Sequence, residues 1–262
     1  MQARRLSVIF WGVLLLGALS WEQGCSKLGD FVDPSTQPVV TTSFSPTPPI
    51  VLPDAIHHWG FENSGADDGT TSGWAGNLSG SATYTSNAAQ VKVGTYALNL
   101  TGTAGDAFSL PSITMPTQMT IACWVLWTQG TGNPNTIFSN STSTVASQSG
   151  FRLYVIDGSG QVVFETTDGT TIVQATSNSN LHTGIYAHVA VSVDTNNVAS
   201  VYINGVTGTS GATQAGFGLT GSAFIGTMAS NANPFNGDID DCRVYDQALS
   251  AAQIQLLYSG TN

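Results

Sequence analysis

Three carboxylates stand close together near the end of the chain, in the stretch "FNGDIDDCRVYDQALSAAQIQLLY" at residues 235–258. Charged residues make up only 8% of the sequence, so the cluster of Asp238, Asp240 and Asp241 needs a cause. If the stretch forms a strand, Asp238 and Asp240 share one side, roughly 6 to 7 Å apart, and Asp241 points to the other. Two carboxylates at that spacing suit glycoside hydrolysis, a hard cation such as Ca²⁺, or the solvated, N–H-accepting edge of a sheet.

The elements that position these acids are short apolar runs separated by turn residues. Six of the runs are "MTIACWVLW" (119–127), "FRLYVI" (151–156), "QVVFETT" (161–167), "HVAVSVD" (188–194), "SVYING" (200–205) and "DCRVY" (241–245). Between neighbouring runs, "DGSG" at 157–160 and "DG" at 168–169 are typical of turns, and Asn204-Gly205 suits a type I′ hairpin. Many short strands at this spacing predict an all-β fold, a two-sheet antiparallel jelly-roll sandwich.

One short helix is predicted at the C-terminus. Ser250 and Gln253 have the spacing of a capping box, and Ile254, Leu257 and Tyr258 form the apolar stripe that docks the helix on the sandwich. We therefore expect the helix to be a structural cap on the domain.

The first 53 residues precede the predicted sandwich. Residues 1–25 have the basic, apolar, polar order of an export signal. "GCSK" around Cys25 resembles the cleavage box of bacterial lipoproteins, which implies a lipid on Cys25 and membrane attachment by that lipid alone; ordinary signal cleavage after Ser20 is the alternative. Residues 26–53 are rich in Pro, Ser and Thr and predict a linker, which leaves 54–262 as one domain. We expect an exported protein, held at the cell envelope or outer surface if lipidated and secreted otherwise.

The charge balance argues against nucleic acid as a partner. The formal net charge is −10, and the only basic residues after the linker are Lys92, Arg152 and Arg243. Phosphate binding needs clustered Lys and Arg, which this domain lacks.

Five stretches resemble, in order, the landmarks of laminin-G-like jelly-roll domains of the concanavalin A-like lectin/glucanase superfamily, as found on bacterial secreted proteins and lipoproteins. They are "HWGFENSG" (58–65), "KVGTYALNLTG" (92–102), "MTIACWV", "YAHVAVSVD…ASVYINGV" (186–206) and "FIGT…FNGDIDDCRVYDQALSAAQIQLLY". The resemblance covers about 55–258, essentially the whole domain. It implies a surface-anchored, lectin-like module that binds a glycan or a component of the extracellular matrix. The alternative is a structural or adhesive protein-binding module without glycan specificity.

Some members of that superfamily are glycosidases, and "DIDD" distantly resembles the Glu-x-Asp-x-Glu strand of laminarinase-like relatives. That strand uses Glu as both nucleophile and acid, whereas the only glutamates in this domain are Glu62 and Glu165, neither of them in this stretch. We therefore expect no enzymatic activity; a degenerate glycosidase is the less favoured alternative.

In similar jelly rolls a structural calcium ion ties the first strand to the last. The resemblance therefore implies Ca²⁺ as a structural cofactor, with Glu62, Asn63, Asp67, Asp68 and Asp240 as its ligands. In the alternative reading these are solvated loop residues, and Asp240 accepts backbone N–H bonds.

Aromatic rings are the usual platform for sugars. Trp74, Trp127 and Tyr154 beside Arg152 are the candidate ligand-binding residues, with packing as the alternative.

His57 and His58 are adjacent on a predicted strand and so face apart, which argues against a paired metal ligand. With Cys25 lipidated or removed, Cys123 and Cys242 remain as a disulfide or as two buried free thiols.

Overall fold

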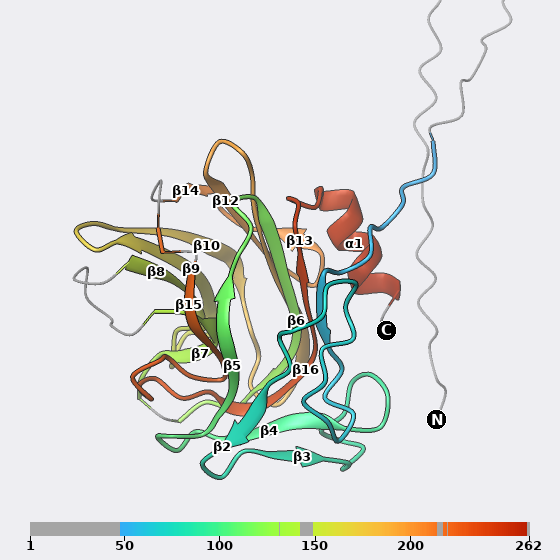
Figure 1. Cartoon of the computed structure of the whole chain (residues 1–262), viewed down its shortest axis with the longest axis vertical. Helices are drawn as coiled ribbons and strands as arrows, with labels where there is room; N and C mark the ends of the chain where they lie inside the picture. Colours follow the sequence, from blue (N-terminus) through green and yellow to red (C-terminus); the bar gives the residue numbers. More distant parts are fainter. Residues whose placement is uncertain (1–47, 131, 142–148, 214–216, 219, 261–262) are drawn as a thin grey trace, which may run out of the picture. The chain divides into compact units, whose positions relative to one another are not determined.

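The computed structural model describes residues 48–130, 132–141, 149–213, 217–218 and 220–260. Two antiparallel β-sheets enclose a hydrophobic core, and a single described helix lies outside them (Figure 1). The predicted all-β jelly-roll sandwich with a short C-terminal helix is therefore confirmed. In the part of the chain that the structure describes, no helix is long and apolar enough to cross a membrane. The predicted export signal, Cys25 and most of the predicted linker lie outside the described residues.

The first sheet has nine strands in the order β13-β12-β11-β6-β16-β4-β3, with β1 paired to β16 and β14 paired to β12. Its strands are β1 (His57–Trp59), β3 (Thr83–Thr85), β4 (Ala97–Thr101), β6 (Met119–Trp127), β11 (Tyr186–Val193), β12 (Val198–Ile203), β13 (Val206–Thr207), β14 (Gly211–Ala212) and β16 (Asn236–Tyr245). The acidic stretch is therefore the strand between β6 and β4, in the middle of this sheet.

The second sheet has seven strands in the order β10-β9-β8-β7-β15-β5-β2. Its strands are β2 (Asn77–Ser79), β5 (Ala107–Thr114), β7 (Asn135–Ser139), β8 (Ser149–Val155), β9 (Gln161–Asp168), β10 (Ile172–Asn180) and β15 (Thr220–Ile225). The turns predicted at 157–160 and 168–169 join β8 to β9 and β9 to β10, and both pairs are antiparallel as expected. The Asn204-Gly205 turn joins β12 to β13 with positive φ at both residues, as a type I′ hairpin requires.

Alternation along the strands decides which side chains enter the core. On β8, Phe151, Leu153 and Val155 belong to the core cluster, whereas Arg152 and Tyr154 point to the outer face, the face turned away from the core. Strand β6 is buried on both faces, as its sequence predicts, because Ala122 and Trp124 on its outer face pack against α1 (Ala251–Gly260).

Helix α1 begins with the predicted capping box. The Ser250 N–H donates to Gln253 Oε1 over 3.0 Å, and the Gln253 N–H donates to Ser250 Oγ over 3.3 Å. Ile254 and Leu257 then pack on Ala122, Ala190, Tyr202 and Tyr245 of the nine-stranded sheet. The helix therefore covers the outer face of that sheet, next to the acidic stretch of β16.

Candidate functional site

Two of the three acids hold a strap, the segment 86–95, against the outer face of the nine-stranded sheet. Asp240 Oδ2 accepts the N–H groups of Lys92 and Val93, each over 2.9 Å. Asp238 accepts the side-chain amides of Gln90, over 3.2 Å, and of Asn99, over 2.7 Å. Both carboxylates are buried, so they serve as anchors for the strap rather than as an open acid pair.

Burial also sets the protonation behaviour of these anchors. Loss of water raises the pKa of Asp240 to about 7, although the N–H groups of Val93, Lys92 and Asp241 act to lower it. Burial raises the pKa of Asp238 as well, against the amide donors of Asn99 and Gln90. Near neutral pH the strap is therefore held by carboxyl groups whose charge is costly to bury.

Simple alternation predicts that Asp241 points to the opposite face from Asp240. This prediction is wrong. Strand β16 carries a bulge between Asp240 and Arg243, and Asp241 adopts a φ of 47°. Two residues then stand where the partner strand has one, so the alternation shifts by one position. Cys242 enters the core instead, and the Asp241 carboxylate joins its neighbours on the outer face.

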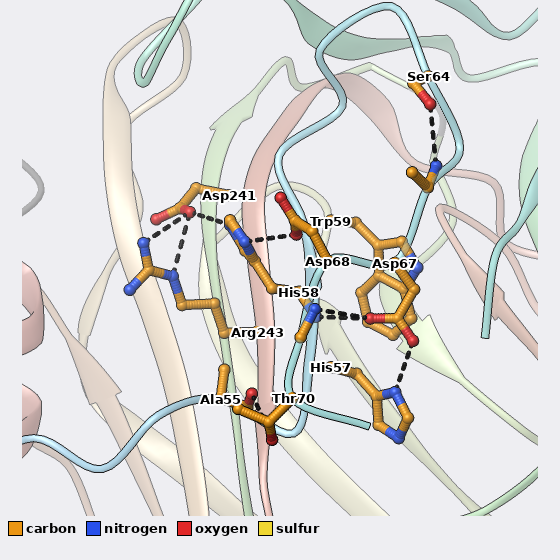
Figure 2. Close-up of polar contacts among 12 residues, drawn as sticks. Ala55, His57, His58, Trp59, Ser64, Asp67, Asp68, Thr70, Asp241 and Arg243 are labelled. Carbon is orange, nitrogen blue, oxygen red and sulfur yellow. Dashed lines mark hydrogen bonds and ion pairs between the residues drawn. The ribbon is translucent and has the colours of Figure 1, made fainter. Parts of the chain in front are cut away.

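There Asp241 contacts His58 of β1, which also contacts Asp68 in the loop after that strand. Figure 2 shows the His58 ring between two carboxylates: Nδ1 lies 2.7 Å from Asp68 Oδ1, and Nε2 lies 2.7 Å from Asp241 Oδ1. Arg243 donates to the same Asp241 oxygen, over 2.9 Å from Nη2. Burial alone would raise the pKa of Asp241, but His58 and Arg243 together hold it below its usual range. A hollow of about 240 Å³ opens beside His58, Asp68 and Arg243.

The predicted calcium ligands fall into separate groups. Asp67 accepts from the His58 and Trp74 N–H groups and contacts His57 Nδ1 (Figure 2), and Asp68 contacts His58. Glu62 accepts the Thr95 N–H of the strap, and Asn63 is exposed with a φ of 53°. The carboxylates thus face N–H donors, which cannot ligate a cation, so as arranged these residues do not fit one calcium shell. Among the described residues, no group of three or more His, Cys, Asp or Glu is placed to hold a metal ion.

Of two predicted sugar-binding rings, one is buried and the other is partly covered. Trp127 is 3% exposed and belongs to the core cluster, because its position on β6 faces inward. Trp74 is half-buried and stacks on His57 with ring centroids 3.5 Å apart, so a neighbouring ring covers it. Trp127 therefore presents no open face for stacking on a sugar. At Trp74 the His57 ring covers one face, and sugar binding by Trp74 stays a prediction. His57 and His58 do face apart, as predicted.

Cys123 and Cys242 form a disulfide between β6 and β16, with Cα atoms 4.2 Å apart. The bulge at Asp241 makes this possible, since it turns Cys242 inward opposite Cys123. Of the two alternatives, the structure therefore shows the bridge rather than the free thiols.

The remaining candidates, Arg152 and Tyr154, point to the outer face of the seven-stranded sheet and are buried there, at 4% and 5% exposed. Arg152 belongs to one cross-strand row that includes a residue from every strand of that sheet. In order of strand position the row is Asn77, Ser109, Phe224, Ser139, Arg152, Glu165 and Gln174. Directly opposed residues share a face, so these side chains follow one line across the sheet, about 29 Å long at the usual strand spacing. Asn77 and Gln174 are exposed at the two ends, Ser109 and Phe224 are partly exposed, and the centre is buried.

A hydrogen-bonded network occupies the centre of this outer row. Arg152 Nη2 donates to Glu165 Oε1 over 3.2 Å, and the guanidinium lies 4.0 Å from the centre of the Tyr154 ring. Glu165 Oε2 accepts from Tyr154 Oη and, over 2.7 Å, from Gln174 Nε2. Burial and the Glu165 charge raise the pKa of Tyr154 to about 12. The buried Arg152 Nε has no hydrogen-bond partner in the described structure.

Sequence reasoning missed Glu165, Gln174 and Phe224. A signal for Glu165 was present: Ile156 and Gln161 flank the four-residue turn, and counting outward from them along the hairpin brings Arg152 opposite Glu165. Gln174 follows by the same counting from the next turn. Phe224 had no such local signal, because β15 reaches its place between β7 and β5 from a distant part of the chain.

With this geometry established, the comparisons with known proteins define the family. A laminin G-type family model, described as the concanavalin A-like lectin/glucanases superfamily, matches residues 101–255, so the chain belongs to this superfamily. A comparison with curated protein sequences returned no match.

Among solved structures, domain 4 of AbnA, a GH43 extracellular arabinanase from Geobacillus stearothermophilus, was determined in complex with arabinotriose. It has a TM-score of 0.61 and 24% identity, over 78% of this chain and 98% of that one. The receptor-binding domain of botulinum neurotoxin type G has a TM-score of 0.59 and 13% identity, over 79% of this chain and 51% of that one. The binding domain of Paraclostridial Mosquitocidal Protein 1 has a TM-score of 0.57 and 15% identity, over 79% of this chain and 52% of that one. At these identities the similarity establishes the fold.

Proposed function

We propose that the protein is an extracellular, surface-anchored, lectin-like module that binds a glycan along the outer row of the seven-stranded sheet. The observation that carries the proposal is the row itself, because it combines amide and hydroxyl side chains with a partly exposed aromatic ring along a line of about 29 Å. Amides and hydroxyls match sugar hydroxyls, and an aromatic ring matches the C–H face of a sugar. The arabinotriose bound to domain 4 of the arabinanase supports a glycan as the class of ligand.

Binding rather than hydrolysis is the activity that the carboxylates support. Asp238 and Asp240, the pair with glycosidase spacing, are both buried and hold the strap by hydrogen bonds. Glu165 is paired with Arg152 and receives two further donors. Release of reducing ends from an array-positive glycan after incubation with the protein would contradict this part of the proposal.

A glycan array probed with the full purified chain tests the binding proposal. We expect binding to at least one oligosaccharide, and a roughly three- to tenfold loss of affinity in Phe224→Ala, the cost of losing one aromatic contact. Leu256→Ala is the matched control, since Leu256 is an apolar residue 38% exposed on α1, away from the row. Absence of any glycan binding would favour a protein-binding, adhesive module. Release of Cys25→Ser from the membrane fraction tests the anchor separately.

A further inference from the structure

We infer that the outer row selects neutral glycans, and that Glu165 is the residue that excludes acidic sugars such as uronates. This inference rests on the proposed function and names the class of ligand for the same site. It concerns the charge balance of the row, which is determined by one ion pair.

Arg152 is the only basic residue in the strands of the seven-stranded sheet. Of the other two basic residues after the linker, Lys92 lies over the Trp124 ring and Arg243 pairs with Asp241, both on the nine-stranded sheet. A sugar carboxylate on the outer row would therefore have Arg152 as its only cationic partner.

Glu165 already neutralises that cation. Arg152 and Glu165 are directly opposed on β8 and β9, 3.2 Å apart, and are 4% and 7% exposed. Charges this deeply buried are poorly screened by water, so an incoming carboxylate meets the repulsion of Glu165 as well as the attraction of Arg152. The row as a whole has no net charge to offer an anion.

At the Gln174 end, the row presents an acceptor rather than a donor. Gln174 Nε2 donates to Glu165 Oε2 over 2.7 Å and to Tyr154 Oη over 3.2 Å, which uses both of its protons. The amide oxygen remains as the hydrogen-bonding atom of this exposed side chain. An acceptor suits the O–H of a neutral sugar and opposes a carboxylate, so the geometry at Gln174 favours the same class as the charge at Glu165.

An array that carries each neutral oligosaccharide beside its uronate counterpart tests the inference. For the parent chain we expect at least tenfold tighter binding to the neutral member of a bound pair. Glu165→Gln keeps the size of the side chain but frees the Arg152 charge, so it should raise affinity for the uronate member at least tenfold, with an effect that weakens as salt is added. Asp246→Asn is the matched control, because it removes one negative charge from an exposed site after β16.

The outcomes distinguish failure of the inference from failure of the proposed function. A parent chain that binds no glycan overturns both, whereas equal binding to neutral and uronate members overturns the inference alone. An unchanged preference in a folded Glu165→Gln, shown by its melting curve, also overturns it. If Glu165→Gln does not fold, Gln174→Lys adds a cation to the row next to Glu165 while keeping both Arg152 and Glu165, and its failure to increase uronate binding has the same meaning.

Discussion

Asp240 is a buried carboxyl group whose oxygens accept three backbone N–H groups, from Lys92, Val93 and Asp241. These donors favour the charged form, but burial opposes it more strongly and raises the pKa to about 7. In the unfolded chain the same group titrates near 3.8. Between these two values the folded protein binds the extra proton, so the contribution of Asp240 to stability increases as pH falls from about 7 to 4.

The variant Asp240→Asn should therefore be more destabilised at pH 4.5 than at pH 8. The difference is at most about 3 kcal/mol, since each pKa unit corresponds to about 1.4 kcal/mol and about 2.5 units lie between pH 4.5 and the folded pKa. Urea unfolding of parent and variant at both pH values measures it. Burial lowers the pKa of His188 to about 4, which has the opposite pH trend, but this term is common to both proteins and cancels. Asp246→Asn, which removes an exposed carboxylate, is the matched control; a pH-independent cost for Asp240→Asn would contradict the account.

At the scale of the element, β16 connects the parts of the nine-stranded sheet. It pairs with β6, β4 and β1, its acids anchor the strap, and its bulge turns Cys242 toward Cys123. Its last residues lead directly into α1, which covers the same sheet. One irregular strand therefore joins the first strand, the strap and the helix.

Loss of the disulfide should lower the free energy of unfolding by roughly 3 to 5 kcal/mol. The bridge closes a loop with a sequence separation of 119, and cross-links of long loops restrict the unfolded chain most. Urea unfolding of Cys25→Ser with and without reductant measures the loss, and Cys123→Ala/Cys242→Ala should match the reduced protein. Two free thiols in unfolded, unreduced Cys25→Ser would contradict the bridge.

At the scale of the whole molecule, a formal net charge of −10 invites the expectation of a bound cation. The structure distributes the relevant acids between the strap, His57 and His58, and satisfies them with N–H donors. Each of these carboxylates is thus stabilised by its own neighbouring donors rather than by one shared ion. Calcium binding stays a prediction of the family resemblance.

From this arrangement we expect the same melting temperature in EDTA and in millimolar calcium. A bound structural ion would instead stabilise the fold by about 2.7 kcal/mol at a hundredfold excess over its Kd. A calcium-dependent rise that Asp240→Asn removes and Asp246→Asn retains would contradict our expectation and restore the ligand set implied by the resemblance.

The sequence alone determined the features that depend on neighbouring residues. Alternation in "FRLYVI" and "QVVFETT" predicted strands with one face in the core, tight turns predicted the β8–β9 and β9–β10 pairings, and Ser250 with Gln253 predicted the helix cap. These features can be predicted from the sequence because they depend on hydrogen bonds and side-chain alternation between residues close together in the chain.

Only the tertiary structure decided what depends on contacts between distant segments. The bulge at Asp241, the inward position of Trp127 and the placement of Phe224 beside Ser139 each follow from how one strand registers against another far along the chain. Side chains along a strand alternate between two faces, so one inserted residue moves each following side chain to the opposite face. No local pattern in the sequence of β16 predicts that insertion. The anchors of the strap and the outer row therefore emerge only when the sheets are assembled.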